Sequence, residues 1–259
     1  ISIVLSNHNG SRFLKETLDS ILQQTYEDWE LIIYDDCSTD SSKEIINSYH
    51  DERIKPFFAE NHEHMVFGFN FGITHSTGEF IARIDSDDIW VADKLEKQLD
   101  AMLNHPEFGA VFSLVTMIDE NGKKLSENDT ERVRWFEVKN KSQAEWLRYF
   151  YFNGSCLCHT TAFINRKVLD EVGLYDLSLI QIHDYELWIR ITKKHPIHVI
   201  QERLTKYRWM SDGSNASSPA RNIMRRSNFE FSYVLGKYFE DMEDKLFVEA
   251  FSSDFTNSN

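Results

Sequence analysis

The stretch GEFIARIDSDD, residues 78–88, joins an apolar run to three closely spaced carboxylates, Asp85, Asp87 and Asp88. The run at residues 80–84 is typical of a buried strand. Open α/β sheets bind their ligands at the carboxyl ends of strands, which is where these carboxylates would lie. Carboxylate oxygens suit Mg²⁺ and Mn²⁺, which keep coordination positions for substrate phosphates. The stretch therefore predicts a divalent-cation site, and a solvated acidic turn is the simpler alternative.

The charge of this cluster restricts what it can bind. A carboxylate about 4 Å from a phosphate charge costs on the order of 1 to 4 kcal/mol, depending on the local dielectric. An acidic pocket therefore repels a bare diphosphate and accepts one that is bridged by a divalent cation. The same cation would stabilise negative charge on a departing diphosphate.

The segments around this stretch alternate between short apolar runs and helix-like periodicity. The runs lie at residues 1–5, 31–34, 54–58 and 80–84. Ser11 can cap a helix that ends near residue 24, and Asp40 or Ser41 can begin another. Such βαβ alternation predicts an α/β fold with a mostly parallel sheet flanked by helices.

The second half of the chain has a less regular pattern. We expect helices at residues 93–103, 166–172, 184–194 and 222–251, and strands at 110–117, 162–165 and 197–200. Residues 119–141 are polar and predict a hairpin or a loop over a site, and residues 211–219 predict a loop. We therefore expect one domain over residues 1–215, with halves at 1–118 and 119–215, and a helical segment over 216–259.

Composition excludes several classes of protein. Among 259 residues, 28 are basic and 42 are acidic, a formal net charge of −14 that disfavours nucleic acid and anionic lipid surfaces. No apolar run is long enough to span a bilayer. Three cysteines and no visible secretion signal favour a reducing compartment without disulfides, so we expect a cytoplasmic protein, with peripheral contact at the inner face of the cell membrane as an option. A longer natural chain is compatible with this sequence.

Two other predicted strands also end in polar residues. Asp35 and Asp36 follow the strand at 31–34, and Ser6 and His8 close the first strand. Side chains at such strand ends can contact a nucleotide base or ribose. Helix capping explains part of the first pair, and any turn after a strand is usually polar, so each signal is weak by itself.

The order of these segments resembles the inverting family 2 glycosyltransferases, which have a GT-A fold. The matching segments are ISIVLSNHN (1–9), SILQQTY (20–26), ELIIYDDCSTD (30–40), NFGI (70–73), GEFIA (78–82) and DSDD (85–88). The resemblance covers residues 1–105 and implies a nucleotide-sugar donor, with UDP the most frequent nucleotide. It implies that Ser6, His8 and Asp36 contact the nucleotide. It also implies that Asp85 lies near ribose and that Asp87 and Asp88 hold Mn²⁺ or Mg²⁺.

The resemblance continues more weakly in the second half. In HDYELW (183–188), Asp184 matches the residue that acts as the base on the acceptor hydroxyl, although a helix N-terminus also favours an acidic residue. His183 stands where the family often has a second acid. Arg208 is the candidate phosphate contact, with a surface ion pair as the alternative. Met210 stands where a histidine often completes the metal site, and a thioether is a poor ligand for a hard cation.

The predicted function is therefore metal-dependent inverting transfer of a sugar from a nucleotide diphosphate to an acceptor hydroxyl. We expect a glycan, lipid-linked or protein acceptor, in bacterial surface polysaccharide or glycoconjugate synthesis. The alternatives are a catalytically silent glycosyltransferase-like binding domain and a phosphoryl-transfer enzyme. His62 and His64 are better explained by base contacts or exposure than by a two-histidine metal site. Trp90, Trp188 and Trp209 could stack on sugars, although burial is the commoner role of tryptophan.

Overall fold

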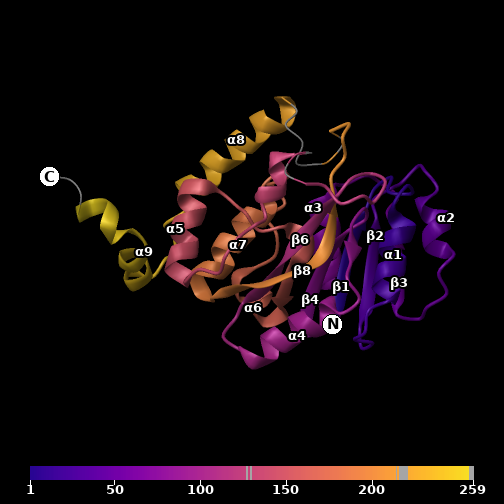
Figure 1. Ribbon diagram of the computed structural model, residues 1–259, viewed down its shortest axis with the longest axis horizontal. Helices are drawn as coiled ribbons and strands as arrows, with labels where there is room; N and C mark the ends of the chain where they lie inside the picture. The colour runs from indigo at the N-terminus through magenta and orange to yellow at the C-terminus, as the bar shows by residue number, and fades with distance from the viewer. Residues whose placement is uncertain (127, 129, 214, 216–220, 257–259) are drawn as a thin grey trace.

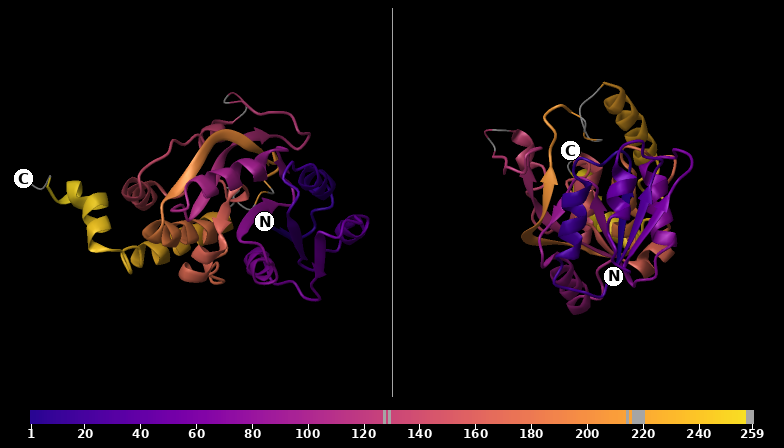
Figure 2. Two further views of the ribbon diagram at one scale, coloured as in Figure 1. Left: turned by 90° about the horizontal axis from the view of Figure 1, so that it is seen from below. Right: turned by 90° about the vertical axis from the view of Figure 1, so that its right-hand side faces the viewer.

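The computed structural model describes residues 1–126, 128, 130–213, 215 and 221–256. Within these residues, eight strands form one sheet in the order β3-β2-β1-β4-β7-β6-β8-β5 (Figure 1). Helices cover both faces of the sheet, as the two views of Figure 2 show. The predicted fold class, a GT-A α/β fold with flanking helices, is confirmed.

The first four strands in chain order are parallel to one another, as predicted. They are β1 (Ser2–Asn7), β2 (Glu30–Asp35), β3 (Ile54–Phe58) and β4 (Phe80–Asp85). Ser6 of β1 lies opposite Asp85 of β4, and Asn7 lies opposite Asp35 of β2. Because parallel strands end at the same edge, this register gathers the polar strand ends along one edge of the sheet.

The other strands extend the sheet with mixed directions. They are β5 (Ile89–Trp90), β6 (Ala110–Ile118), β7 (Phe163–Asn165) and β8 (Ile197–Arg208). β7 runs antiparallel to both β4 and β6, whereas β8 is parallel to β6. β8 is much longer than the strand predicted at 197–200, because it pairs with the whole of β6 through irregular steps near Ser113 and Leu114.

Helices alternate with the strands. They are α1 (Leu14–Leu22), α2 (Ser42–Asn47), α3 (Met65–Thr74), α4 (Lys94–Asn104), α5 (Gln143–Asn153), α6 (Arg166–Val172), α7 (His183–Lys194), α8 (Arg221–Gly236) and α9 (Asp244–Thr256), with 3₁₀ turns η1 (Glu131–Arg134) and η2 (His159–Thr161). The helix predicted at 222–251 is two helices. α3 and α5 were not predicted. α5 begins with a capping box between Ser142 and Glu145, a signal that the sequence does contain.

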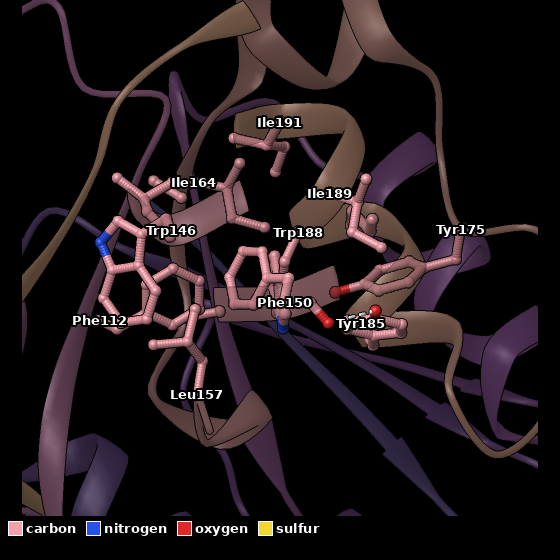
Figure 3. Packing of buried hydrophobic residues seen from close by; sticks show 14 of the residues in the cluster. Phe112, Trp146, Phe150, Leu157, Ile164, Tyr175, Tyr185, Trp188, Ile189 and Ile191 are labelled. Atoms are coloured by element: carbon pink, nitrogen blue, oxygen red, sulfur yellow. Dashed lines mark hydrogen bonds between the residues drawn. The ribbon is translucent and has the colours of Figure 1, made fainter. Parts of the chain in front are cut away.

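Among the described residues, the core has one large cluster on each face of the sheet and a small third one at Val115, Met117 and Cys158. Ile3 and Leu5 pack with α1 and α4, whereas Val4 packs with α3 on the other face, as alternation along a strand requires. Figure 3 shows the second cluster, where Trp188 of α7 meets Phe112 of β6 edge-on with ring centroids 4.7 Å apart. Trp90 and Trp188 are therefore core residues rather than sugar platforms.

The C-terminal helices pack on the half of the domain that carries α5 and α7, away from β1 to β3 (Figures 1 and 2). The Tyr238 hydroxyl donates to the backbone carbonyl of Leu147, and Lys193 donates to that of Glu240. None of the described helices combines the length and apolar character needed to cross a bilayer. The domain boundary after residue 215 stays a prediction.

Candidate active site

A cavity of about 370 Å³ opens where β4, β8 and the start of α7 converge. Asp85 and Asp87 line it from the end of β4, and Asp184 lines it from the first turn of α7. The fold thus brings two of the three predicted DSDD carboxylates together with the predicted base, about 100 residues later in the chain. The other lining residues are Met65, Arg83, Met117, Arg132, Trp135, Phe136, Ser155, Leu157, Cys158, His159, Thr160, Ile180, Gln181, His183, Tyr207, Trp209 and Asn215.

The DSDD carboxylates differ in their surroundings. Asp85 accepts a hydrogen bond from Arg83 at 2.5 Å. Burial and the charge of Asp85 raise the pKa of Asp87 to about 7. Asp88 is 0% exposed and does not line the cavity; its Oδ1 accepts the backbone N–H of Arg208 at 2.8 Å. The structure thus offers Asp87 to a ligand in the cavity and turns Asp88 towards β8, which differs from the predicted pair of metal ligands.

Arg208 also lies elsewhere than predicted. It is 1% exposed, and its guanidinium donates to the Glu16 carboxylate at 2.6 Å and to the backbone carbonyls of Asp87 and Asp119. The long β8 carries this side chain beneath the DSDD turn, where all three guanidinium nitrogens have protein partners. Arg208 therefore supports the backbone of Asp87 and does not face a phosphate in the cavity.

A second polar group lies at the ends of β1 and β2. One Asp36 oxygen accepts the backbone N–H of Glu63, and the other lies 2.9 Å from Nδ1 of His62. Nδ1 of His8 lies 2.7 Å from the backbone oxygen of Asp36, and the His8 and His62 rings are 4.4 Å apart. Nitrogen and carboxylate atoms of His8, Asp36 and His62 lie within 4.8 Å of one another and could hold a metal ion. Of His62 and His64, which lie close together in the sequence, only His62 belongs to this group.

Ser6 lies on β1, between the cavity carboxylates on β4 and the polar group at the end of β2. It lies opposite Asp85 across the β1–β4 register and faces Gly68 of α3 so closely that a Cβ there would be 2.3 Å from its hydroxyl oxygen. A side chain at position 68 would displace Ser6 or α3. The predicted nucleotide contacts Ser6, His8 and Asp36 therefore lie one or two strands from the cavity carboxylates, along the same sheet edge.

The segment just before Asp184 is held by a contact from the C-terminal helices. α7 has no side-chain cap of its own, and the Glu230 carboxylate of α8 accepts the backbone N–H groups of Ile180, Gln181 and Ile182 at 3.1, 2.8 and 3.1 Å. Burial raises the pKa of Asp184, which makes its carboxylate a stronger proton acceptor. Burial also lowers the pKa of its neighbour His183, so this imidazole is neutral near pH 7.

Sequence reasoning missed two cavity arginines. Arg83 is 3% exposed, pairs with Asp85 and lies 3.9 Å over the Phe69 ring. A charged residue inside the apolar run at 80–84 was a signal that could have revealed it. Arg132 lies in η1, inside the segment predicted only as a hairpin or loop, and no sequence signal marked it. The start of that segment, residues 119–125, does form a hairpin-like turn, with Leu125 donating to Met117 at the end of β6.

Comparison with known proteins gives the family. The model of glycosyl transferase family 2 matches residues 2–173. An uncharacterised glycosyltransferase, MJ1057 of Methanocaldococcus jannaschii, is 32% identical over 213 residues, covering 80% of this chain and 70% of that protein. TuaG of Bacillus subtilis, a putative teichuronic acid biosynthesis glycosyltransferase, is 37% identical over 224 residues, covering 84% and 82%. The chain spans only 41% and 40% of two rickettsial relatives.

A named activity and two solved structures add to this. WfgD of Escherichia coli, a UDP-Glc:alpha-D-GlcNAc-diphosphoundecaprenol beta-1,3-glucosyltransferase, is 27% identical over 246 residues, covering 93% of this chain and 87% of that protein. Staphylococcus aureus TarS 1–349 with UDP superposes with a TM-score of 0.70 at 17% identity, covering 99% and 72% of the two chains. The mannosyltransferase PcManGT of Pyrobaculum calidifontis, with GDP-Man and Mn²⁺, superposes with a TM-score of 0.63 at 16% identity, covering 96% of this chain and 68% of that chain. The chain is a glycosyltransferase that belongs to glycosyl transferase family 2.

Proposed function

We propose that this protein transfers a sugar from a UDP-sugar to an acceptor hydroxyl with inversion at the anomeric carbon. The carrying observation is that Asp184 and the pair Asp85 and Asp87 line one cavity of about 370 Å³. In the proposed step, the acceptor oxygen forms a bond to the anomeric carbon while the bond to the diphosphate breaks. Asp184 takes the hydroxyl proton, which its raised pKa favours.

The residues present fit a divalent cation at the donor diphosphate. Asp87 lines the cavity, and the charge of Asp85 helps to raise its pKa to about 7, so this turn has an excess of negative charge. We propose Asp87 as the cation ligand and Asp88 and Arg208 as residues that position its backbone. Bound Mn²⁺ or Mg²⁺ supplies positive charge to the departing diphosphate. Asp85 would contact ribose, and Ser6, His8 and Asp36 the nucleotide.

The acceptor assignment rests on the relatives. TuaG is named for teichuronic acid synthesis, and WfgD for a diphosphoundecaprenol acceptor. We propose that this chain likewise contributes to bacterial surface polysaccharide or glycoconjugate synthesis on a lipid-linked acceptor, in the cytoplasm at the inner face of the membrane. We also propose that residues 1–118 bind the donor and that 119–215 bind the acceptor, with 216–259 as a supporting helical segment.

The test is release of UDP from a panel of UDP-sugars with Mn²⁺. We expect Asp87→Asn to lower turnover by at least about a hundredfold, as loss of a transition-state charge contact does, and Asp184→Asn to do the same without weakening UDP binding. Asp100→Asn, on the exposed face of α4, is the matched control. Undiminished turnover in Asp87→Asn would refute the metal role, and UDP-sugar binding without any UDP release by the wild-type protein would support the silent binding domain.

A further inference from the structure

Arg132 lies over two indole rings at the wall of the cavity. Its guanidinium carbon is 4.5 Å from the ring centre of Trp135 and 4.1 Å from that of Trp209, and all three residues line the cavity. Contacts with two rings restrict the planar guanidinium, because cation–π contacts favour the ring faces. We refer to Arg132, Trp135 and Trp209 as the arginine clamp.

The clamp has donor capacity that none of the described residues uses. Nη1 of Arg132 is buried and has no hydrogen-bond partner among the residues that the structure describes. A buried guanidinium N–H without an acceptor is costly, so such a group marks a place where a ligand acceptor belongs. The other cavity arginine, Arg83, is paired with Asp85 through Nη2, although its Nε and Nη1 are also buried without a partner among the described residues. Within the described part of the chain, Arg132 thus forms no ion pair with the carboxylates that line the cavity.

The chemistry of the clamp indicates the ligand. A planar guanidinium binds phosphate or carboxylate oxygens in a fork, so Arg132 suits an anionic group of the substrate. The Trp135 ring, 50% exposed, offers an apolar face beside the charge, which suits a sugar ring. A ligand that carries an anionic group next to a sugar ring is a glycosyl phosphate or diphosphate.

We propose that Arg132 binds the phosphate or diphosphate group of the acceptor, while Trp135 and Trp209 pack against the acceptor sugar. This inference rests on the proposed function. Two features favour the acceptor over the donor as the source of the phosphate. The clamp lies within residues 119–215, the proposed acceptor half, which also carries Asp184, and the proposed cation ligand Asp87 already serves the donor diphosphate.

The test compares three probes by calorimetry with Arg132→Gln and Arg132→Lys. The probes are an N-acetylglucosaminyl diphosphate alkyl ester, the matching alkyl glycoside without phosphate, and UDP with Mn²⁺. Arg132→Gln should weaken the diphosphate ester about tenfold to a hundredfold, the size expected for charge-assisted hydrogen bonds, and leave the glycoside and UDP unchanged. Arg132→Lys should restore part of the affinity. Arg134→Gln, from the same 3₁₀ turn but outside the cavity lining, is the matched control.

Each other outcome has a definite meaning. A loss of UDP binding in Arg132→Gln with no effect on the diphosphate ester would overturn the acceptor assignment, and unchanged binding of both would overturn a phosphate role altogether. Melting curves of each variant separate these results from unfolding. If the wild-type protein binds the ester but releases no UDP from any donor, the proposed transfer fails while the clamp inference stands.

Discussion

Removing the Glu230 carboxylate should loosen the segment that carries the proposed base. This carboxylate is 4% exposed and accepts three consecutive backbone N–H groups, those of Ile180, Gln181 and Ile182, just before α7 begins. Asp184 follows two residues later. In Glu230→Ala, three N–H groups of the segment that leads into the twelve-residue helix α7 lose their acceptor.

The magnitude follows from these contacts. A hydrogen bond to a charged group contributes about 1.5–3 kcal/mol, but three bonds that share one carboxylate do not add fully. We expect Glu230→Ala to lower the free energy of unfolding by about 3–5 kcal/mol. At about 2–4 °C per kcal/mol for a chain of this size, this lowers Tm by about 6–20 °C. Glu230→Gln keeps an oxygen for Gln181 and Ile182 and should lose only about 1–2 kcal/mol.

The assay combines thermal denaturation with donor turnover. Because Asp184 loses its support while the DSDD turn does not, turnover should fall in Glu230→Ala at temperatures where the protein stays folded, and UDP binding with Mn²⁺ should be unchanged. Glu249→Ala, at an exposed position of α9, controls for loss of a surface charge. If Glu230→Ala matched Glu249→Ala in both Tm and turnover, the support of residues 180–182 by Glu230 would be refuted.

Two further predictions concern the donor side. Burial and the charge of Asp85 raise the pKa of Asp87 to about 7, so a proton competes with a cation below that pH. The Mn²⁺ affinity should therefore be about tenfold weaker at pH 6 than at pH 8. Calorimetry in two buffers would detect the accompanying proton release. An affinity independent of pH would contradict this. A Cβ at Gly72 would lie 2.4 Å from Cγ1 of Val4, so Gly72→Ala should destabilise the protein by about 1–3 kcal/mol. Gly236→Ala, where a Cβ meets open space, should not; equal denaturation midpoints for the two variants would argue against close packing of α3 on β1.

Local patterns predicted the donor half well. Strands at 1–5, 31–34, 54–58 and 80–84 correspond to β1 to β4, because each is a short apolar run bounded by polar turns. α3 escaped prediction for a physical reason: it packs in the core through residues such as Val66 and Phe69 but carries apolar residues almost all round, so it shows little of the 3.6-residue periodicity that marks an amphipathic helix.

For the candidate site too, the sequence identified some residues, and the orientation of others depended on the fold. Residue types and their order identified Asp85, Asp87 and Asp184, and the fold brings all three to one cavity. Their metal, ribose and base roles stay predictions. The orientations of Asp88 and Arg208 could not be read from the sequence, because they depend on how far β8 extends along β6.

The sequence by itself determined the α/β class and the chemistry available at its strand ends, since both depend on local periodicity and on residue types that follow one another in the chain. The GT-A fold followed from the resemblance to family 2. Only the tertiary structure decided which carboxylate of DSDD faces the cavity, that Glu230 binds the segment before α7, and that Arg132 lies over two tryptophan rings. Each of these depends on contacts between residues tens of positions apart or more, and the pattern around either partner alone does not encode the distance between them.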